Sequence, residues 1–298
     1  MAAKAFRVKR ATVSSSLDGI AAVTFYFNHA NCPRLRQNAE RFVEHWHGFA
    51  VPLYVVEVIC GRRKPHLTGA NVSVVRVRDP LFHKEAAINY AVANLPAEKD
   101  IVVWVDSDLI FDLRSLRRLR PTLENATAVQ LFSEIQYLDA NGEHENRLKR
   151  SFVDDNRNGY HGGAWACRRD TFEAIGGLPK FSVTGGGDSI FLMAVFGDEL
   201  VSRWDWYIDK HSTTVAQSIR SYAAANHRFL NGRVACMNAK AVHLWHGATE
   251  KREYQSRHKM IESVAVDQIK FDKNGFPYLQ GAPKARKEIA EYWKRRKC

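Results

Sequence analysis

The feature that most constrains this chain is a run of five apolar residues that ends in two acids. Residues 101–105 read Ile-Val-Val-Trp-Val, and Asp106, Ser107 and Asp108 follow directly. An unbroken apolar run is typical of a central strand in a parallel sheet that is covered on both faces. Ligands of open α/β sheets bind beyond the carboxyl ends of such strands, which is where the acids lie. If the strand continues through Ser107, both carboxylates point to the same side.

Two carboxylates this close repel each other unless a cation lies between them, and Mg²⁺ or Mn²⁺ prefers oxygen ligands of this kind. Phosphate groups complete the shell of such an ion, so the pair suggests a transferase that uses a nucleotide-diphosphate sugar. The alternative is a strand followed by an acidic turn, because Asp and Ser favour turns and so short a motif recurs by chance.

The composition is that of an ordinary globular protein with one large domain or two intimate halves. Of the 298 residues, 45% are hydrophobic and 26% are charged. Residues 1–20 are basic but lack the apolar core of a signal peptide, and no segment is long enough to span a bilayer. The five cysteines never form a Cys-x-x-Cys pair. We therefore expect a cytoplasmic protein with free thiols.

Basic residues outnumber acidic ones by 44 to 32, which gives a formal net charge of +12. Such a surface attracts nucleic acid, anionic lipid or acidic glycan by the same long-range electrostatics, so charge alone does not choose among them. A DNA acceptor or an anionic membrane surface is therefore a possible partner. A solvated basic face with no partner is the alternative.

Strands and helices alternate over the first 110 residues. Apolar runs predict strands at 20–27, 53–59, 72–77 and 101–105, and helical periodicity predicts helices at 33–46 and 84–95. This alternation predicts a parallel, doubly wound sheet. The pattern is looser afterwards, with strands at 128–132 and 162–167, a loop at 139–158 and helices at 169–175, 190–196 and 284–297. The last helix looks like a terminal brace or an anion-binding arm.

Several short motifs occur in one order along the chain. They are Phe82-His83-Lys84 with Asn89, Val105-Asp106-Ser107-Asp108-Leu109-Ile110, Gly162-Gly163, Phe172 with Ile175-Gly176-Gly177, Gly186-Gly187-Asp188 and His243-Leu244-Trp245-His246. Together they resemble the β-1,4-galactosyltransferases and their relatives among chondroitin polymerases and polypeptide N-acetylgalactosaminyltransferases. The resemblance covers about residues 25–251, and the order of the motifs is far more specific than any one of them.

The resemblance implies an α/β fold of the GT-A type. This fold has a doubly wound, Rossmann-like and mostly parallel central sheet, a smaller acceptor-side subdomain and, here, a basic C-terminal helix. We expect residues 1–298 to form one catalytic domain. Its nucleotide-sugar half would span about 20–125, its acceptor and metal-completing half about 126–250, and its helical extension about 251–298.

The resemblance also implies a metal ion, Mn²⁺ or Mg²⁺, and a nucleotide-sugar donor. Asp108 corresponds to the family's direct metal ligand, while Asp106 would lie near the donor's ribose or support the metal. His246 matches a metal-binding histidine, and His243 stands where the galactosyltransferases carry a methionine. In a regular strand, residues i and i+3 face opposite ways, so both histidines can bind metal only if the backbone turns.

Five further positions match the family's donor-binding segments. They are Asn28, Lys84, Asn89, Gly186 and Gly187. Lys84 stands where the family has an arginine, and it keeps the charge but loses the bidentate geometry toward a diphosphate. A turn residue at Asn28 and a surface lysine at Lys84 are the simpler interpretations.

Asp188 matches the acid that inverting members use as general base. It would take the proton of the acceptor hydroxyl as that oxygen attacks the anomeric carbon. The alternative is that Asp188 caps the helix that follows, which would make it a weaker base. Gly187 replaces the family's first acid, so we expect a different acceptor pocket. Trp165, Trp204 and Trp206 either stack against a sugar or base, or belong to the core.

The leading hypothesis is an inverting, metal-dependent glycosyltransferase that moves a sugar, UDP-linked in most of the family, to an acceptor hydroxyl. Hydroxymethylated bases in DNA are one acceptor that fits the basic charge. A cytoplasmic polysaccharide or a lipid-linked acceptor is the rival. Two hypotheses of other classes remain, a non-catalytic module that binds nucleic acid or glycan, and a metal-dependent nucleotidyltransferase, which would not need Asp188.

Overall fold

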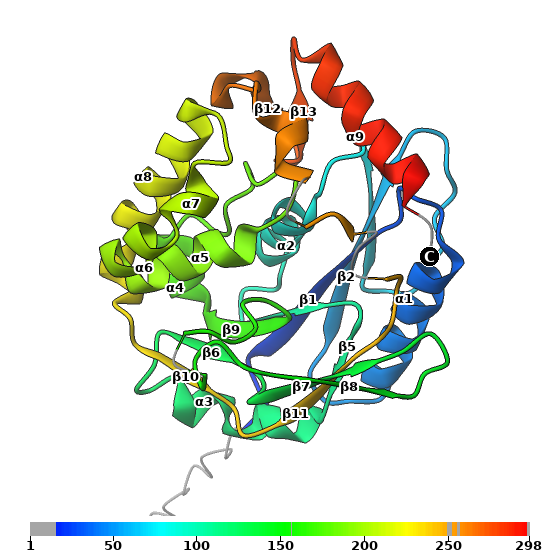
Figure 1. The fold of residues 1–298 in the computed structure, drawn as a ribbon. Coiled ribbons are helices and arrows are strands. Elements are labelled where there is room, and N and C mark those ends of the chain that lie inside the picture. Colours follow the sequence, from blue (N-terminus) through cyan, green and yellow to red (C-terminus); the bar gives the residue numbers. More distant parts are fainter. Residues whose placement is uncertain (1–15, 156, 249–251, 255–256, 297–298) are drawn as a thin grey trace, which may run out of the picture.

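The fold is known from a computed structural model, which describes residues 16–155, 157–248, 252–254 and 257–296. Within these residues, no helix has the length and apolar character needed to cross a membrane. The chain forms one large mixed sheet with helices on both faces, a smaller sheet beside its carboxyl edge, and a C-terminal helix (Figure 1).

The large sheet is mostly parallel, as the sequence predicts. Its strand order is β10-β6-β9-β4-β1-β2-β3. The strands are β1 (Ile20–Phe27), β2 (Leu53–Cys60), β3 (Val72–Val77), β4 (Ile101–Asp106), β6 (Ala128–Gln130), β9 (Ala164–Arg168) and β10 (Val234–Cys236). Strand β9 is the exception, because it runs antiparallel to both of its neighbours, β4 and β6.

Alternate residues of the central strands pack into two different cores. In β4, Val102 and Trp104 join one cluster, whereas Val103 and Val105 join the other. The first cluster lies under α2 (Lys84–Ala93), α5 (Gly187–Phe196) and α8 (Thr213–Leu230), and the second under α1 (Pro33–Trp46). Burial on both faces explains why β4 has no polar alternation, and it confirms the doubly wound α/β architecture.

The remaining elements are short. The helices are η1 (Leu113–Arg118), α3 (Leu119–Thr122), α4 (Arg169–Ala174), α6 (Asp198–Arg203), α7 (Asp205–Ile208), η3 (Arg257–Ile261) and η4 (Val266–Gln268), and β12 (Ile269–Phe271) pairs with β13 (Pro277–Leu279). The smaller sheet has the order β5-β11-β7-β8, with β5 (Leu109–Phe111), β11 (Lys240–His243), β7 (Glu134–Leu138) and β8 (His144–Arg150).

Three expectations are corrected. The predicted loop at 139–158 contains β8, whose polar residues gave no strand signal because it is an edge strand held by backbone pairing to β7. Strand β4 ends at Asp106 instead of continuing through Ser107. Cys32 is disulfide-bonded, whereas Cys60, Cys167 and Cys236 are free; the spacing of cysteines does not reveal pairs that the fold brings together.

The predicted C-terminal helix is α9 (Pro283–Arg295), and it serves as a brace. Ile289, Tyr292 and Trp293 are buried. The Trp293 ring lies 4.8 Å from that of Phe82, two residues before Lys84. The helix therefore supports the segment that leads into α2 and the predicted donor site.

Candidate active site

The two acids of the Asp-x-Asp segment point to different partners. A turn separates the end of β4 at Asp106 from β5, so the carboxylates do not share one face as a continued strand would require. The backbone N–H of Asp106 donates to Gly163 O at 2.7 Å, which ties the end of β4 to the loop before β9. Asp106 faces Lys84, and Asp108 faces two histidines.

Asp108, His243 and His246 form a group that could hold a metal ion. One ligand atom from each residue can be chosen so that all lie within 4.8 Å of one another. Nε2 of His246 lies 2.8 Å from Oδ2 of Asp108, and Nε2 of His243 lies 3.7 Å from the same oxygen. Both histidines are almost fully buried. Two imidazoles and a carboxylate form a donor set suited to a divalent transition metal.

The two histidines meet because β11 ends at His243. That residue pairs antiparallel with Leu109, the first residue of β5, so it lies next to the Asp-x-Asp turn. Beyond it the chain leaves the strand, and Leu244 N donates to Asp108 O at 2.8 Å. Asn38 of α1 donates to Trp245 O at 3.0 Å and holds the turn from the other side. In a regular strand the two imidazoles would face opposite ways, but this turn brings both of them to the side of Asp108.

The protonation states of the three residues suit metal binding. Burial lowers the pKa of His243 to about 4, and burial also lowers the pKa of His246. Although burial by itself raises the pKa of Asp108, the neighbouring histidines lower it below its usual range. At neutral pH the group therefore offers two neutral imidazoles and one carboxylate, the forms that coordinate metal.

Lys84, the first residue of α2, lies between two acids from distant parts of the chain. Its Nζ is 2.7 Å from Oδ1 of Asp106 and 2.8 Å from Oδ2 of Asp188. Although burial lowers the pKa of Lys84, the two carboxylates raise it above its usual range, so the side chain stays charged. The lysine is thus a counter-ion with only 13% of its side chain exposed, in contrast to the simpler interpretation of a surface residue.

Two acids near Lys84 hold protons unusually tightly. Burial raises the pKa of Asp106 to about 7, against the opposing effect of Lys84. Burial likewise raises the pKa of Glu85 to about 8. The Glu85 carboxyl lies against Gly187, where a Cβ atom would overlap it. Glu85 is therefore protonated in most molecules at pH 7. It does not compete with Asp188 of α5 for the positive charge of Lys84.

Asp188 lies in the first turn of α5, and glycines make room for it. The helix begins after Gly186, which has a φ of 95°, a backbone conformation that favours glycine. A Cβ atom on Gly162 would overlap Oδ2 of Asp188. The two glycine motifs therefore have different roles. Gly186 allows the backbone turn that begins α5, and Gly162 leaves space for the Asp188 side chain.

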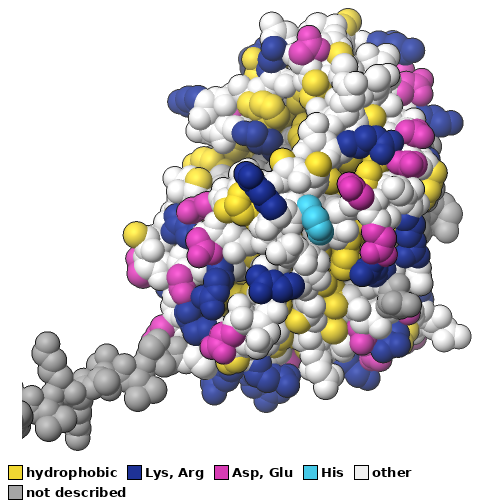
Figure 2. Space-filling model, turned by 90° about the vertical axis from the view of Figure 1, so that its left-hand side faces the viewer, with side chains coloured by type: hydrophobic (Ala, Val, Ile, Leu, Met, Phe, Trp, Pro, Cys, Tyr) yellow, Lys and Arg dark blue, Asp and Glu magenta, His cyan; other side chains and the backbone are white. Residues whose placement is uncertain are grey.

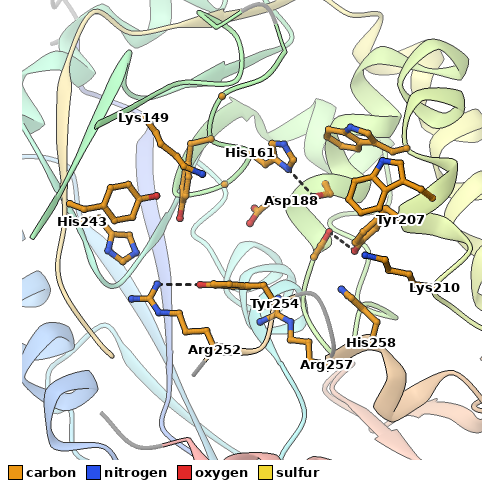
Figure 3. Close-up of a pocket in the computed structure, with 18 of the residues that line it drawn as sticks. Lys149, His161, Asp188, Tyr207, Lys210, His243, Arg252, Tyr254, Arg257 and His258 are labelled. Atoms are coloured by element: carbon orange, nitrogen blue, oxygen red, sulfur yellow. Dashed lines mark hydrogen bonds between the residues drawn. The ribbon is translucent and has the colours of Figure 1, made fainter. Parts of the chain in front are cut away.

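Two cavities meet at Asp188. The smaller, of 210 Å³, contains the candidate metal group, Asp106 and Lys84. The larger, of 440 Å³, extends under β8 and α7 (Figure 3). Seven residues line both, namely Tyr160, Gly186, Asp188, His243, Arg252, Tyr254 and Arg257. A molecule in one cavity would therefore contact a molecule in the other beside the Asp188 carboxylate.

Three predicted donor-binding residues lie outside both cavities. Asn28 uses its side chain in the loop after β1, where it accepts from Cys32 N and donates to Cys32 O, both at 2.8 Å. Asn89 bonds the backbone N–H and C=O of Leu178, each at 2.8 Å. Gly187 packs on Glu85. A donor-binding role for these three stays a prediction, while Lys84, Asp106, Asp108, Asp188, Gly186 and both histidines come together.

The three tryptophans have different surroundings. Trp165 is fully buried in the sheet, as the core interpretation predicts. Trp204 and Trp206 line the larger cavity, and the Trp206 side chain is 56% exposed. The Trp206 ring is therefore accessible to a ligand that enters this cavity.

Sequence reasoning missed several cavity residues because they lie outside the motifs, although Tyr160 and His161 directly precede Gly162-Gly163. They are Lys149, Tyr160, His161, Tyr207, Lys210, Arg252, Tyr254, Arg257 and Arg296. Lys149, Lys210, Arg252, Arg257 and Arg296 belong to polar or basic segments that look like solvent-exposed surface in the sequence. The closest available signal was the polar stretch 139–158, which was predicted as a loop near the acceptor side.

Comparisons with known proteins give structural likeness only. No protein-family model and no curated protein matches the sequence. The chain is similar to a mutant of Drosophila β1,4-galactosyltransferase 7 in complex with manganese, UDP-Gal and xylobiose, at 12% identity over 88% of this chain and 92% of that one, with a TM-score of 0.40. Glucosyl-3-phosphoglycerate synthase from Mycobacterium tuberculosis, with Mn²⁺, UDP-glucose and phosphoglyceric acid, is similar at 17% identity over 81% and 76%, with a TM-score of 0.41.

A third similar structure is 4-diphosphocytidyl-2C-methyl-D-erythritol synthase from Anaerococcus prevotii. It has 12% identity over 75% of this chain and 89% of that one, with a TM-score of 0.38. At these scores the likeness says nothing about substrate, and the function proposed below is based on the residues of this chain.

Proposed function

We propose that this protein is a metal-dependent glycosyltransferase that moves a sugar from a nucleotide-diphosphate sugar, UDP-linked, to an acceptor hydroxyl. The observation that carries this proposal is the position of Asp188. Its carboxylate lies where a cavity with a candidate metal group meets a second, larger cavity. A donor and an acceptor can therefore meet at a single carboxylate.

The smaller cavity has the features of a site for a diphosphate on a metal ion. Asp108, His243 and His246 would hold the metal, and their two imidazoles favour Mn²⁺ over Mg²⁺, which prefers oxygen ligands. The bound metal would offset the negative charge that develops on the departing diphosphate. The cations of the same cavity, Lys84, Arg252 and Arg296, add to this stabilisation.

The transfer step is proposed as a single displacement. The acceptor hydroxyl oxygen forms a bond with the anomeric carbon of the sugar while the bond from that carbon to the diphosphate oxygen breaks. The hydroxyl proton passes to the Asp188 carboxylate, and the electron pair of the broken bond leaves with the nucleoside diphosphate. This route inverts the configuration at the anomeric carbon.

The nature of the acceptor is a separate proposal. The net charge of +12 makes hydroxymethylated DNA one candidate acceptor. A duplex-binding surface usually needs basic residues gathered along one face. On the face seen in Figure 2, basic and acidic side chains are interspersed. The charge distribution of this face therefore does not favour DNA over a polysaccharide or lipid-linked acceptor.

Donor use can be tested directly. The enzyme is incubated with a panel of nucleotide sugars with and without Mn²⁺, and release of nucleoside diphosphate is measured. We expect release from one donor, dependent on Mn²⁺ and lost in D108N. If no nucleotide sugar binds in the presence of Mn²⁺, the proposal is wrong. If pyrophosphate is released from a nucleoside triphosphate instead, the protein is a nucleotidyltransferase.

A further inference from the structure

The larger cavity is strongly cationic. Among the described residues that line it, five side chains are basic and one, Asp188, is acidic. The basic residues are Arg147, Lys149, Lys210, Arg252 and Arg257. Burial lowers the pKa of His161 to about 4 and that of His258 to about 3, so these two rings are neutral at pH 7. Basic side chains therefore outnumber acidic ones among the described residues that line this cavity.

Arg257 is the most informative of these cations. This residue is 9% exposed, and its Nε atom has no hydrogen-bond partner among the residues that the structure describes. The guanidinium lies 4.6 Å from the Phe82 ring centroid and 4.8 Å from that of Tyr254. No ion pair joins it to an acid within the parts of the chain that the structure describes. Burying an unpaired guanidinium is costly, so a ligand anion is the partner that this position suits.

The backbone has made room for this guanidinium. Gly185 has a φ of 83°, and a Cβ atom there would lie 2.5 Å from Nη2 of Arg257. Any other residue at position 185 would displace the arginine. In Figure 3, Arg257 and Lys210 lie on the lower side of the cavity and Lys149 lies across it, with Asp188 between them. Cationic side chains of the cavity therefore lie on two sides of Asp188 in this view.

The cavity also offers a surface for a ring. The exposed Trp206 indole lines it, and Nζ of Lys210 lies 4.5 Å from the centre of that indole. Sugar rings stack their apolar faces on indoles of this kind. An aromatic face next to cations suits a ring that carries a negative group.

We propose that the acceptor is a small sugar-like molecule that carries a phosphate or carboxylate, and that Arg257 and Lys149 bind this anion while its hydroxyl faces Asp188. This inference rests on the proposed glycosyl transfer and names its acceptor class. Charge-assisted bonds from a guanidinium to phosphate or carboxylate are among the strongest polar contacts in proteins. The donor diphosphate has cations of its own, because Lys84 and Arg296 line only the smaller cavity. Arg257 and Lys149 are therefore available to the acceptor.

The test compares neutral and anionic forms of one sugar. Glucose, glucose 6-phosphate and glucuronate are titrated by calorimetry into the enzyme loaded with Mn²⁺ and UDP. We expect the two anions to bind at least tenfold more tightly than glucose. In R257Q and K149Q this preference should fall at least fivefold, while UDP affinity changes less than threefold. K270Q, which removes a charge from the exposed side of β12, is the matched control and should keep the preference.

Several outcomes would overturn this inference. Equal binding of all three probes, no measurable binding of either anion, or a preference that survives in R257Q would each do so. So would a loss of UDP affinity in R257Q without any change in sugar binding, because Arg257 would then serve the donor. Tighter binding of a hydroxymethylated DNA duplex than of either anion would favour the DNA acceptor. In all these cases UDP binding with Mn²⁺ would still support the transferase.

Discussion

Nζ of Lys84 lies 2.8 Å from a carboxylate oxygen of Asp188, although the two residues are 104 positions apart in the sequence. The same ammonium group also pairs with Asp106 at 2.7 Å. The acid proposed as the base is therefore held in place by a cation from the donor side of the cavity. In the proposed reaction, Lys84 would therefore contribute both to donor binding and to the positioning of the base.

Replacing Asp188 by asparagine should abolish transfer without abolishing donor binding. Asparagine keeps the shape of the side chain but cannot accept the proton of the acceptor hydroxyl, so we expect kcat to fall by about 10²- to 10⁴-fold. The affinity for UDP with Mn²⁺, measured by calorimetry, should change less than threefold. Transfer by D188N at a near-normal rate would show that another group is the base.

Removing Lys84 should destabilise the fold. K84M leaves Asp106 and Asp188 partly buried without their counter-ion, and loss of one partner from such a group costs about 3 kcal/mol. Denaturation in urea would measure this loss. Adding D188N to K84M removes one unpaired acid, so we expect about 1 kcal/mol to return. A double variant no more stable than K84M would contradict this account.

The metal group predicts a specific pattern of Mn²⁺ affinities. H246A and H243A should each weaken Mn²⁺ binding at least tenfold, because each removes one of three protein ligands. Titration followed by electron paramagnetic resonance would measure the affinity. H47A, at an exposed histidine just beyond α1, is the control and should bind Mn²⁺ normally. If H243A behaves like H47A, then His243 is not a ligand.

The buried Glu85 predicts a pH effect on stability. Burial raises its folded-state pKa to about 8 from an ordinary value of 4.5. Between these values the unfolded chain ionises first, so stability falls as pH rises, by about 1.4 kcal/mol for each pH unit of that interval, and levels off above it. E85Q lacks this titration. We expect its stability relative to the wild type to increase from pH 5 to pH 8, and parallel stability curves would refute the assignment.

A substitution of Asn89 can distinguish a structural role of this residue from a role in donor binding. Its side chain makes two hydrogen bonds to the backbone of Leu178. N89A should therefore lower the free energy of unfolding by about 1–3 kcal/mol through the unsatisfied backbone groups. Its affinity for UDP with Mn²⁺ should match that of the wild type. A weakened affinity with unchanged stability would restore the donor-binding prediction.

The sequence predicted those features that depend on local pattern. The apolar run of β4, the periodicity of α1 and the amphipathic α9 each follow from burial on known faces, and the structure confirms them. The edge strand β8 was missed because its residues HENRLKR contact solvent on both sides and lack any alternation. Pairing with β7, which makes it a strand, is not visible in its own residues.

The site was predictable only in part, for a similar reason. The motifs supplied Asp108, His246 and Asp188, whereas the direction of each side chain depended on where a strand stops. Asp106 and Asp108 diverge because β4 ends between them, and His243 joins His246 because β11 ends there. Arg257 was invisible because its importance comes from the absence of a partner among described residues, which only three-dimensional packing reveals.

The reversed direction of β9 has a consequence for how this protein can change. Because β9 runs antiparallel to β4, β9 begins at the edge of the sheet where β4 ends. The loop that leads into β9 therefore lies at this edge. This loop supplies Tyr160, His161 and Gly162 to the larger cavity, while the metal group lies in the turn before β5 and around the end of β11. Within the proposed function, an exchange at His161, which lines only the larger cavity, can therefore alter the acceptor without touching the metal group. Gly162 is constrained by its contact with Asp188, so the loop is free to vary only on the side that faces away from the proposed base.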